Sequence, residues 1–289
     1  MILLKTVSTL TETEISDFRR LESVVKIHDG LQGDLSLEFG MNVIQSMDNI
    51  FMLYENNVLL SALTIFLPSM KAAEINGFTH PEHRKQGHFR SLLIEAIRVL
   101  SDYLPIDLLF VCESGSEPGL KAVERFGGVL AFSEYELEFD ASTQTIPALD
   151  RKNLSIRKAV PSDLNALVEI SKKTFHDRAE DAERFILQSM ASEHKIQYVA
   201  TLDDIIIGMG ACSIEEATSY LVGLSIDPDY QGKGYGKILV NLLMNELVQS
   251  GKKHLSIEVD SSNASAYHIY LNAGFKLNVA FGYYLKHLI

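Results

Sequence analysis

Residues 227 to 237 read Asp227-Pro228-Asp229-Tyr230-Gln231-Gly232-Lys233-Gly234-Tyr235-Gly236-Lys237. An apolar run from Tyr220 to Ile226 precedes this stretch, and an amphipathic run from Ile238 to Val248 follows it. This order predicts a strand, a glycine-rich turn and the start of a helix. Glycines let the backbone curl until several N–H groups converge on one point, and a helix start adds a partial positive charge. The stretch therefore predicts a phosphate-binding loop.

Two other glycine-rich phosphate loops are excluded by their spacing. A Walker A loop needs Ser or Thr after its lysine, but Lys237 is followed by Ile238. A dinucleotide fingerprint needs G-x-G-x-x-G, whereas the spacing here is G-x-G-x-G. The pattern Gln231-x-x-Gly234-x-Gly236 resembles instead the acetyl-CoA pyrophosphate loop of the GCN5-related N-acetyltransferase (GNAT) family.

A second pattern lies downstream and reads Asn263-x-x-Ala266-x-x-x-Tyr270-x-x-x-Gly274. Ala266, Tyr270 and Gly274 are spaced four apart, so they share one face of the predicted helix. Taken alone, this could be a packing stripe with a half-buried tyrosine. With the phosphate loop upstream, it resembles the second signature of the same family.

Acetyl transfer to an amine needs a neutral amine, a polarised thioester carbonyl and a proton for the leaving thiolate. The resemblance implies that Tyr270 protonates the sulfur of CoA. It also implies that Glu258, twelve residues earlier, deprotonates the amine through water. Glu258 could equally be a solvated strand carboxylate. Glu215 and Glu216 are rival bases, although they suit a polar hairpin turn.

The resemblance further implies how CoA is held. The strand that ends at Ile226 is expected to diverge from the strand His254–Val259, so that the pantetheine arm enters the gap. The expected CoA-binding residues are Leu224, Ser225, Ile226, Gln231, Gly232, Lys233, Gly234, Tyr235, Gly236, Lys237, Asn263 and Tyr270. The N–H of Ile226 would polarise the thioester carbonyl. Asn263 also suits a helix N-cap, and the two lysines could merely be solvated.

The two halves of the chain share a pattern of landmark residues, which indicates an internal repeat. Three landmarks recur at one offset of 147 residues (228 less 81): Pro81 with Pro228, Gly87 with Gly234, and Gly127 with Gly274. Such a repeat predicts a duplicated domain. The small polar stretch after Asp140 is the expected boundary, which gives domains over residues 1–145 and 152–289.

The first copy lacks the residues expected to act. At the shared offset, Tyr270 corresponds to Val123, Glu258 to Val111, Asn263 to Ser116, Gly236 to Phe89 and Gln231 to Arg84. We therefore expect a catalytically silent copy that is structural or helps to form the acceptor pocket. Gly87 with Arg84, Lys85 and Arg90 could still hold a phosphate. Cys112 and Glu113 lie beside the lost positions, but no pattern gives them the chemistry.

The expected fold is α/β (α+β) with two tandem GNAT-like domains. Each would be a mixed, mostly antiparallel twisted sheet with a splayed central parallel strand pair, flanked by helices. Two equivalent hairpins are predicted, turning at 55–57 and at 203–204. Tyr283 and Tyr284, on the predicted last strand, are candidates to line the acceptor pocket.

Composition narrows the class of protein. The net charge of −12 over 289 residues argues against nonspecific nucleic-acid binding. The two cysteines show no metal-ligand spacing, and no apolar run is long enough for a membrane span or a signal peptide. We therefore expect a cytoplasmic acetyl-CoA-dependent N-acetyltransferase without a metal, monomeric or homodimeric. Its acceptor would be a primary amine of a small molecule or peptide, and neither nucleic acid nor membrane is an expected partner. The alternatives are a non-catalytic acyl-CoA sensor and a protein N-acetyltransferase.

Overall fold

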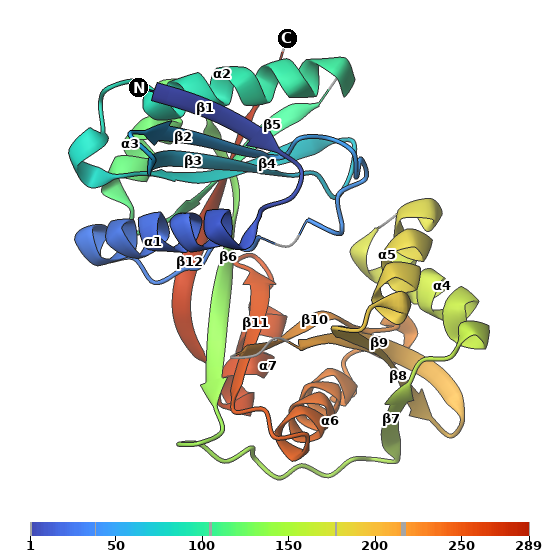
Figure 1. Cartoon of the computed structure of the whole chain (residues 1–289). Helices are drawn as coiled ribbons and strands as arrows, with labels where there is room; N and C mark the ends of the chain where they lie inside the picture. The colour runs from blue at the N-terminus through green and yellow to red at the C-terminus, as the bar shows by residue number, and fades with distance from the viewer. Residues whose placement is uncertain (1, 38, 104–105, 177, 215–217, 289) are drawn as a thin grey trace. The chain divides into compact units, whose positions relative to one another are not determined.

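The computed structural model describes residues 2–37, 39–103, 106–176, 178–214 and 218–288. The chain forms two compact units. The first consists of Met1–Glu134 together with Val279–Ile289, and the second of Tyr135–Asn278. Figure 1 shows the helices and strands of both.

The first unit is built on a sheet in the order β1-β2-β3-β4-β5-β12, in which β4 and β5 are the parallel pair. Its elements are β1 (Ile2–Val7), α1 (Glu12–Asp29), β2 (Ile50–Glu55), β3 (Val58–Phe66), β4 (Ala72–Thr79), α2 (His88–Leu100), β5 (Asp107–Glu113), α3 (Glu117–Phe126) and the first part of β6 (Val129–Asp140). Separate apolar clusters join the sheet to α1 and to α2, so both faces of this sheet are covered.

The second unit repeats this plan in the order β6-β11-β10-β9-β8-β7, with β10 and β11 parallel. Its elements are β7 (Leu154–Lys158), α4 (Leu164–Phe175), α5 (Ala179–Ala191), β8 (Lys195–Leu202), β9 (Ile205–Ile214), β10 (Thr218–Ile226), α6 (Tyr235–Gln249), β11 (His254–Asp260), α7 (Ala264–Ala273) and the start of β12 (Lys276–Lys286). The larger apolar cluster packs α6 and α7 on the sheet, and a smaller one packs α4 and α5. Figure 1 shows these two pairs of helices on opposite sides of β8, β9 and β10.

The last strand of each half of the sequence begins in its own unit and ends in the other. Strand β6 begins in the first unit and ends in the second, where Ser256 of β11 donates to the carbonyl of Leu137. Strand β12 begins in the second unit and ends in the first, where its residues 281–286 pair with β5. The compact units therefore differ from the sequence ranges 1–145 and 152–289 at these two strands.

Local sequence explains most of the elements. Thr11 and Glu14 form a capping box at the start of α1, and Gly30 ends that helix in the left-handed conformation. Both predicted hairpins are confirmed. Their turns place Asn56 and Asn57, and likewise the pair at 203–204, at positive φ, as tight turns between strands require.

The repeat is also present in the backbone geometry. Gly87 precedes α2 with φ 87° and ψ 1°, and Gly234 precedes α6 with φ 90° and ψ 0°. Nε of Arg84 donates to the carbonyl of Thr79 at 3.2 Å, and Nε2 of Gln231 donates to the carbonyl of Ile226 at 2.9 Å. These positions correspond at the offset of 147, so the two loops share one architecture.

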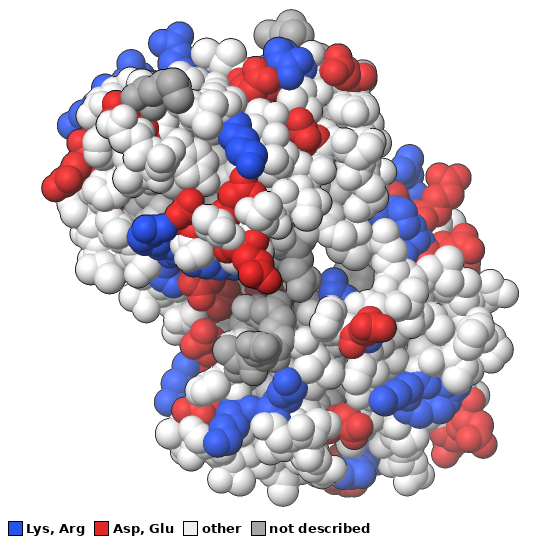
Figure 2. All heavy atoms as spheres, in the orientation of Figure 1, with Lys and Arg blue, Asp and Glu red and all other residues white. Residues whose placement is uncertain are grey.

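The surface carries both signs of charge. Figure 2 shows Lys and Arg interspersed with Asp and Glu on the face in view, without a continuous basic patch. Among the described helices, none is both long and apolar enough to cross a membrane.

Candidate active site

The two central strands of the second unit separate, as predicted. Strand β10 pairs with β11 from Thr218–His254 to Leu221–Ile257, and the pairing then stops although β10 continues to Ile226. On its other side β10 pairs with β9, with a register shift between Val222 and Ser225. A bulge of this kind bends a strand away from its neighbour. The last residues of β10 therefore have no strand pairing on the edge that faces β11.

The backbone at this strand end faces the gap. The N–H of Asp227 donates to Ile207 of β9 at 2.8 Å. Because successive N–H groups along a strand alternate between its two edges, the N–H of Ile226 points to the side from which β11 has diverged. The side chain of Ser225 points elsewhere and donates to Oγ1 of Thr174 at 2.9 Å. Only its backbone is therefore available to the expected CoA site.

The glycine loop leaves the start of α6 uncapped. Gly232 and Gly234 have φ of 73° and 90°, and Gly234, at the N-cap, has no side chain to accept from the first turn. A Cβ at Gly232 would meet no atom within 4 Å, so the loop borders open space. The first N–H groups of a helix without a cap need another partner. An uncapped helix start of this kind is where phosphate groups commonly bind in proteins, because N–H donors and the positive end of the helix dipole lie there.

The side chains of Gln231 and Lys233 bond to different parts of the loop. The amide of Gln231 ties the loop to the carbonyl of Ile226, so it holds the loop against the strand end. Lys233 donates to the carbonyl of Asp229 at 3.0 Å and lies 5.1 Å from the ring centre of Tyr230. Tyr235, Gly236 and Lys237 form the first turn of α6.

Lys152, which the sequence motifs did not indicate, also contacts the glycine loop. Nζ of Lys152 donates to the carbonyl of Lys233 at 3.1 Å and lies 3.6 Å from the position of a Cβ on Gly234. Lys152 precedes β7 and has a positive φ of 48°. It lies 81 residues from Lys233 in the sequence, and no spacing rule links the two.

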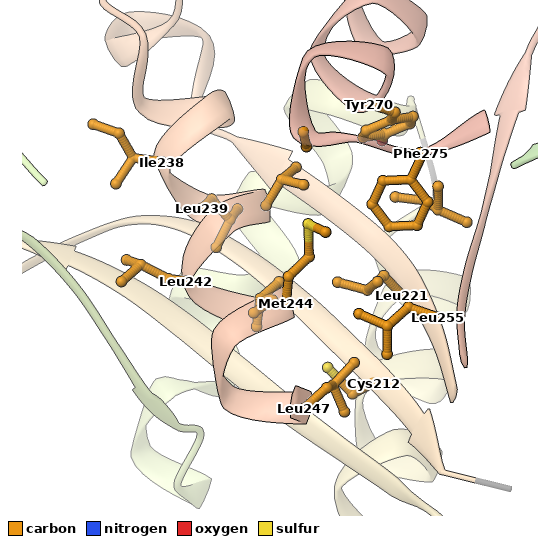
Figure 3. Packing of buried hydrophobic residues seen from close by; sticks show 14 of the residues in the cluster. Cys212, Leu221, Ile238, Leu239, Leu242, Met244, Leu247, Leu255, Tyr270 and Phe275 are labelled. Atoms are coloured by element: carbon orange, nitrogen blue, oxygen red, sulfur yellow. The ribbon is translucent and has the colours of Figure 1, made fainter. Parts of the chain in front are cut away.

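Tyr270 lies on α7 at the edge of the larger core. It is 8% exposed, and its ring meets that of Phe275 edge-on with centroids 6.3 Å apart. Figure 3 shows the two rings together, beside Leu221 and Leu255. Burial raises the pKa of Tyr270 to about 12. The phenol therefore keeps its proton throughout the neutral range, as an acid must before it acts.

Glu258 and Asn263 flank the same region. Glu258 is an exposed residue of β11, one position beyond the last residue paired with β10. Asn263 is the N-cap of α7, and its Oδ1 accepts from the N–H of Ala266 at 3.1 Å. The capping role foreseen for Asn263 is confirmed, which leaves the amide nitrogen for any further contact.

The corresponding part of the first unit is built differently. Strand β4 pairs with β3 without a register shift, so it lacks the bulge of β10. The guanidinium of Arg84 donates to both carboxylate oxygens of Asp29, at 2.9 and 2.5 Å, and thereby lowers the pKa of that carboxyl. Arg84 is thus committed to an internal ion pair. Burial raises the pKa of Cys112 to about 11, so this thiol is not a ready nucleophile.

Two further pairs of residues that the sequence offered are not found at the second unit's site. Glu215 and Glu216 lie outside the described residues. Tyr283 and Tyr284 belong to the first unit because β12 pairs there with β5. The ring of Tyr283 stacks on Phe132 with centroids 4.4 Å apart.

Part of the second half of the chain matches a known protein family. The sequence profile described as "Acetyltransferase (GNAT) family" matches residues 164–275. This segment holds the bulged strand, the glycine loop and α7 with Tyr270. Residues 164–275, which are less than half of the chain, therefore match a GNAT acetyltransferase domain.

Relatives of this domain act on different acceptors. The chain is 24% identical over 222 residues to a mycothiol acetyltransferase from Saccharomonospora viridis, covering 68% of this chain and 69% of that protein. It is 42% identical over 62 residues to the [ribosomal protein bS18]-alanine N-acetyltransferase of Escherichia coli, covering 22% of this chain and 40% of that protein.

Solved structures extend the likeness to the whole chain. A GCN5-related N-acetyltransferase from Sphaerobacter thermophilus matches with a TM-score of 0.82 at 15% identity, covering 99% of this chain and 95% of that chain. A tandem GNAT protein from the clavulanic acid biosynthesis pathway matches with a TM-score of 0.75 at 12% identity, covering 99% and 98%. The tandem GNAT fold predicted from the sequence is confirmed.

Proposed function

We propose that the protein is an acetyl-CoA-dependent N-acetyltransferase that moves the acetyl group directly to a primary amine within a ternary complex. One observation carries the proposal. In the second unit, a bulged strand end, an uncapped helix start and a buried, protonated tyrosine follow one another within the GNAT domain. The first unit lacks the bulge and the tyrosine.

Each group has a distinct task. The N–H groups of the loop and of the first turn of α6 hold the diphosphate of acetyl-CoA, which supplies an activated acetyl thioester. The N–H of Ile226 stabilises negative charge on the carbonyl oxygen, as backbone donors do in acyl transfer. The hydroxyl of Tyr270 gives its proton to the departing sulfur. Glu258 accepts a proton from the amine through water.

The proposal is tested by release of free thiol from acetyl-CoA in the presence of primary amines. The panel contains an amino sugar, a peptide with an N-terminal alanine and spermidine, none of which carries a thiol, with their N-acetylated forms as controls. We expect turnover with at least one amine and none with the acetylated forms. Tight binding of acetyl-CoA without turnover on any amine would support the sensor alternative instead.

The base assignment predicts a change in pH dependence. In Glu258→Gln, the fall in rate toward low pH should disappear, because an amide cannot take up the proton that inactivates a carboxylate base. We expect the remaining rate to be roughly ten- to a hundredfold lower at neutral pH. The measurement is kcat at saturating acetyl-CoA and amine from pH 5 to 9, so that protonation of the free amine does not contribute, with Glu183→Gln on α5 as the control. An acidic limb that persists in Glu258→Gln under these conditions would assign the base elsewhere.

Lys152 is expected to contribute to CoA affinity. Lys152→Met removes a positive charge beside Gly234, so the Kd for CoA should rise roughly three- to tenfold. Lys152→Arg keeps the charge and should restore most of the affinity. Calorimetry at two salt concentrations provides the measurement, since an ionic contribution weakens as salt rises. Equal affinities of the methionine variant and the unmodified protein would exclude this contact.

A further inference from the structure

The two residues that flank Ile226 point their side chains to one face of the sheet. Side chains alternate along a strand, so those of Ser225 and Asp227 lie on the face opposite that of Ile226. The side chain of Ile226 is buried in the cluster that packs α6 on the sheet. Helix α4 lies on the other side of the sheet (Figure 1). The residues before and after Ile226 therefore face α4.

The last turn of α4 binds both flanking side chains. Oγ of Ser225, which is buried, donates to Oγ1 of Thr174 at 2.9 Å. Nζ of Lys173 donates to Oδ2 of Asp227 at 2.8 Å. Two consecutive residues of one helix thus hold the residues on either side of Ile226. The backbone N–H of Ile226 lies between these two points of attachment.

The ion pair with α4 remains charged at neutral pH. Burial opposes the ionisation of Asp227, but the bonds from Lys173 and from the N–H of Asp229 outweigh burial and lower the pKa of this carboxyl. The bond to Asp227 in turn raises the pKa of Lys173. Because the lysine side chain is 45% exposed, such a pair adds little to overall stability. Its effect is to direct the carboxylate, and the strand end with it, toward the helix.

Helix α4 is anchored independently of these two bonds. Leu167 and Ile170 of α4 are buried in an apolar cluster with Val199 of β8 and Met209 of β9. Close-packed side chains of this kind leave a helix little freedom to shift. The last turn of α4 is therefore a fixed point from which the end of β10 can be held.

The end of β10 needs such support because its own pairing is incomplete. Its pairing with β11 stops after Leu221, and its register against β9 shifts between Val222 and Ser225. Backbone with few partners moves more readily than fully paired strands do. A donor that stabilises charge in a transition state must be fixed in advance, since a displacement of about 1 Å can cost roughly a hundredfold in rate.

The first copy lacks the residues that form these contacts. At the offset of 147, no hydroxyl remains at the first two positions and no carboxylate at the third: they are Ile27 for Thr174, Phe78 for Ser225 and His80 for Asp227. Lys26 corresponds to Lys173, but it forms an ion pair with Asp34 instead. The attachment to the helix is thus found in the copy that carries the candidate acid, and the silent copy is built without it.

We propose that Lys173 and Thr174 are positioning residues, which hold the N–H of Ile226 where the carbonyl oxygen of acetyl-CoA becomes negatively charged. The inference rests on the proposed acetyl transfer and adds to it two residues of α4 that lie outside the sequence motifs. Neither of them touches the reacting atoms. Thr174 acts through Ser225, and Lys173 acts through Asp227.

The test separates the rate of the chemical step from binding. Thr174→Val keeps the shape of the side chain and removes the acceptor, so kcat should fall roughly five- to thirtyfold while the Kd for acetyl-CoA changes by less than about twofold. Thr174→Ser restores an acceptor and should recover most of the rate. Lys173→Met should lower kcat in the same way. The matched control is Lys172→Met, since Lys172 pairs with Glu169 on the same helix and should leave kcat unchanged.

A measurement without ligand keeps the inference distinct from catalysis. In protein labelled with ¹⁵N at isoleucine, relaxation dispersion of the Ile226 amide should show millisecond exchange in Thr174→Val and none in the unmodified protein or in Lys172→Met. Unchanged relaxation or unchanged kcat in Thr174→Val would overturn the proposal, as would an equal loss of kcat in Lys172→Met. If the unmodified protein acetylates no amine, the proposed function fails, and the relaxation of Ile226 still decides whether α4 holds the strand end.

Discussion

Replacing Gly234 with valine is expected to weaken acetyl-CoA binding by roughly a hundredfold or more, equivalent to about 2.7 kcal/mol. Gly234 has φ of 90° and ψ of 0°, a conformation that a β-branched residue avoids. Among the described residues, the atom that a Cβ there would meet is Nζ of Lys152, at an ordinary 3.6 Å. The effect should therefore come from backbone strain that turns the loop N–H groups away from their common point. Calorimetric titration with acetyl-CoA measures it.

The chain supplies a matched control for this change. Gly87 has nearly the same geometry, with φ of 87° and ψ of 1°, and a Cβ there would meet no atom of the described residues within 4 Å. Gly87→Val imposes a similar strain on the first unit, so both variants should lose comparable thermal stability. Only Gly234→Val should lose affinity for acetyl-CoA. Equal loss of affinity in the two variants would mean that strain anywhere in the protein, rather than this loop, governs binding.

Removing the hydroxyl of Tyr270 is expected to lower turnover by roughly ten- to a thousandfold, the usual range for a general acid. Tyr270→Phe keeps the aromatic ring that packs on Phe275, so the Kd for acetyl-CoA should change little. The matched control is Tyr267→Phe on the same helix, where the ring packs on Tyr135. Single-turnover rates separate the chemical step from binding and product release. Similar rates for the two variants would remove Tyr270 from the mechanism.

The buried phenol also predicts a change in stability at high pH. In the unfolded chain a tyrosine loses its proton near pH 10, whereas burial raises the pKa of Tyr270 to about 12. A raised native pKa stabilises the folded protein below the unfolded pKa, and this stabilisation is lost as the pH rises from about 10 to about 12. Urea denaturation of Tyr270→Phe should therefore show a smaller loss of stability over that interval than the unmodified protein shows. A loss of equal size would mean that Tyr270 is not buried in solution.

Much of the architecture could be read from local patterns because local chemistry controls it. A two-residue turn between strands requires positive φ, and the asparagine pair at 56–57 tolerates that conformation better than most residues do. Gly234 before an amphipathic run predicts a loop that opens a helix, and Asn263 three residues before Ala266 predicts a cap. In each case the residues that decide the conformation are neighbours in the sequence. The offset of 147 then carries the same inferences to the first copy.

Contacts between distant residues could not be read in this way. Lys152 donates to the carbonyl of Lys233 across 81 residues of sequence, a contact that exists only in the folded chain. From the sequence, Arg84 is a candidate phosphate ligand. In the structure it forms an ion pair with Asp29, which lies 55 residues away in the sequence. Side-chain contacts of this kind depend on the tertiary structure, which brings distant segments of the chain together.

The amino-acid sequence was sufficient for the tandem fold, the glycine loop and the face of α7 that carries Tyr270, because short-range periodicity and backbone preference dictate them. The assignment of the last strands was decided by tertiary structure. Strands β6 and β12 are equivalent in the repeat, yet each ends in the unit formed mainly by the other half of the chain. Their hydrogen-bonding edges and alternating side chains suit either sheet, so no local preference distinguishes the two pairings. Only the packing of the folded chain selects one of them.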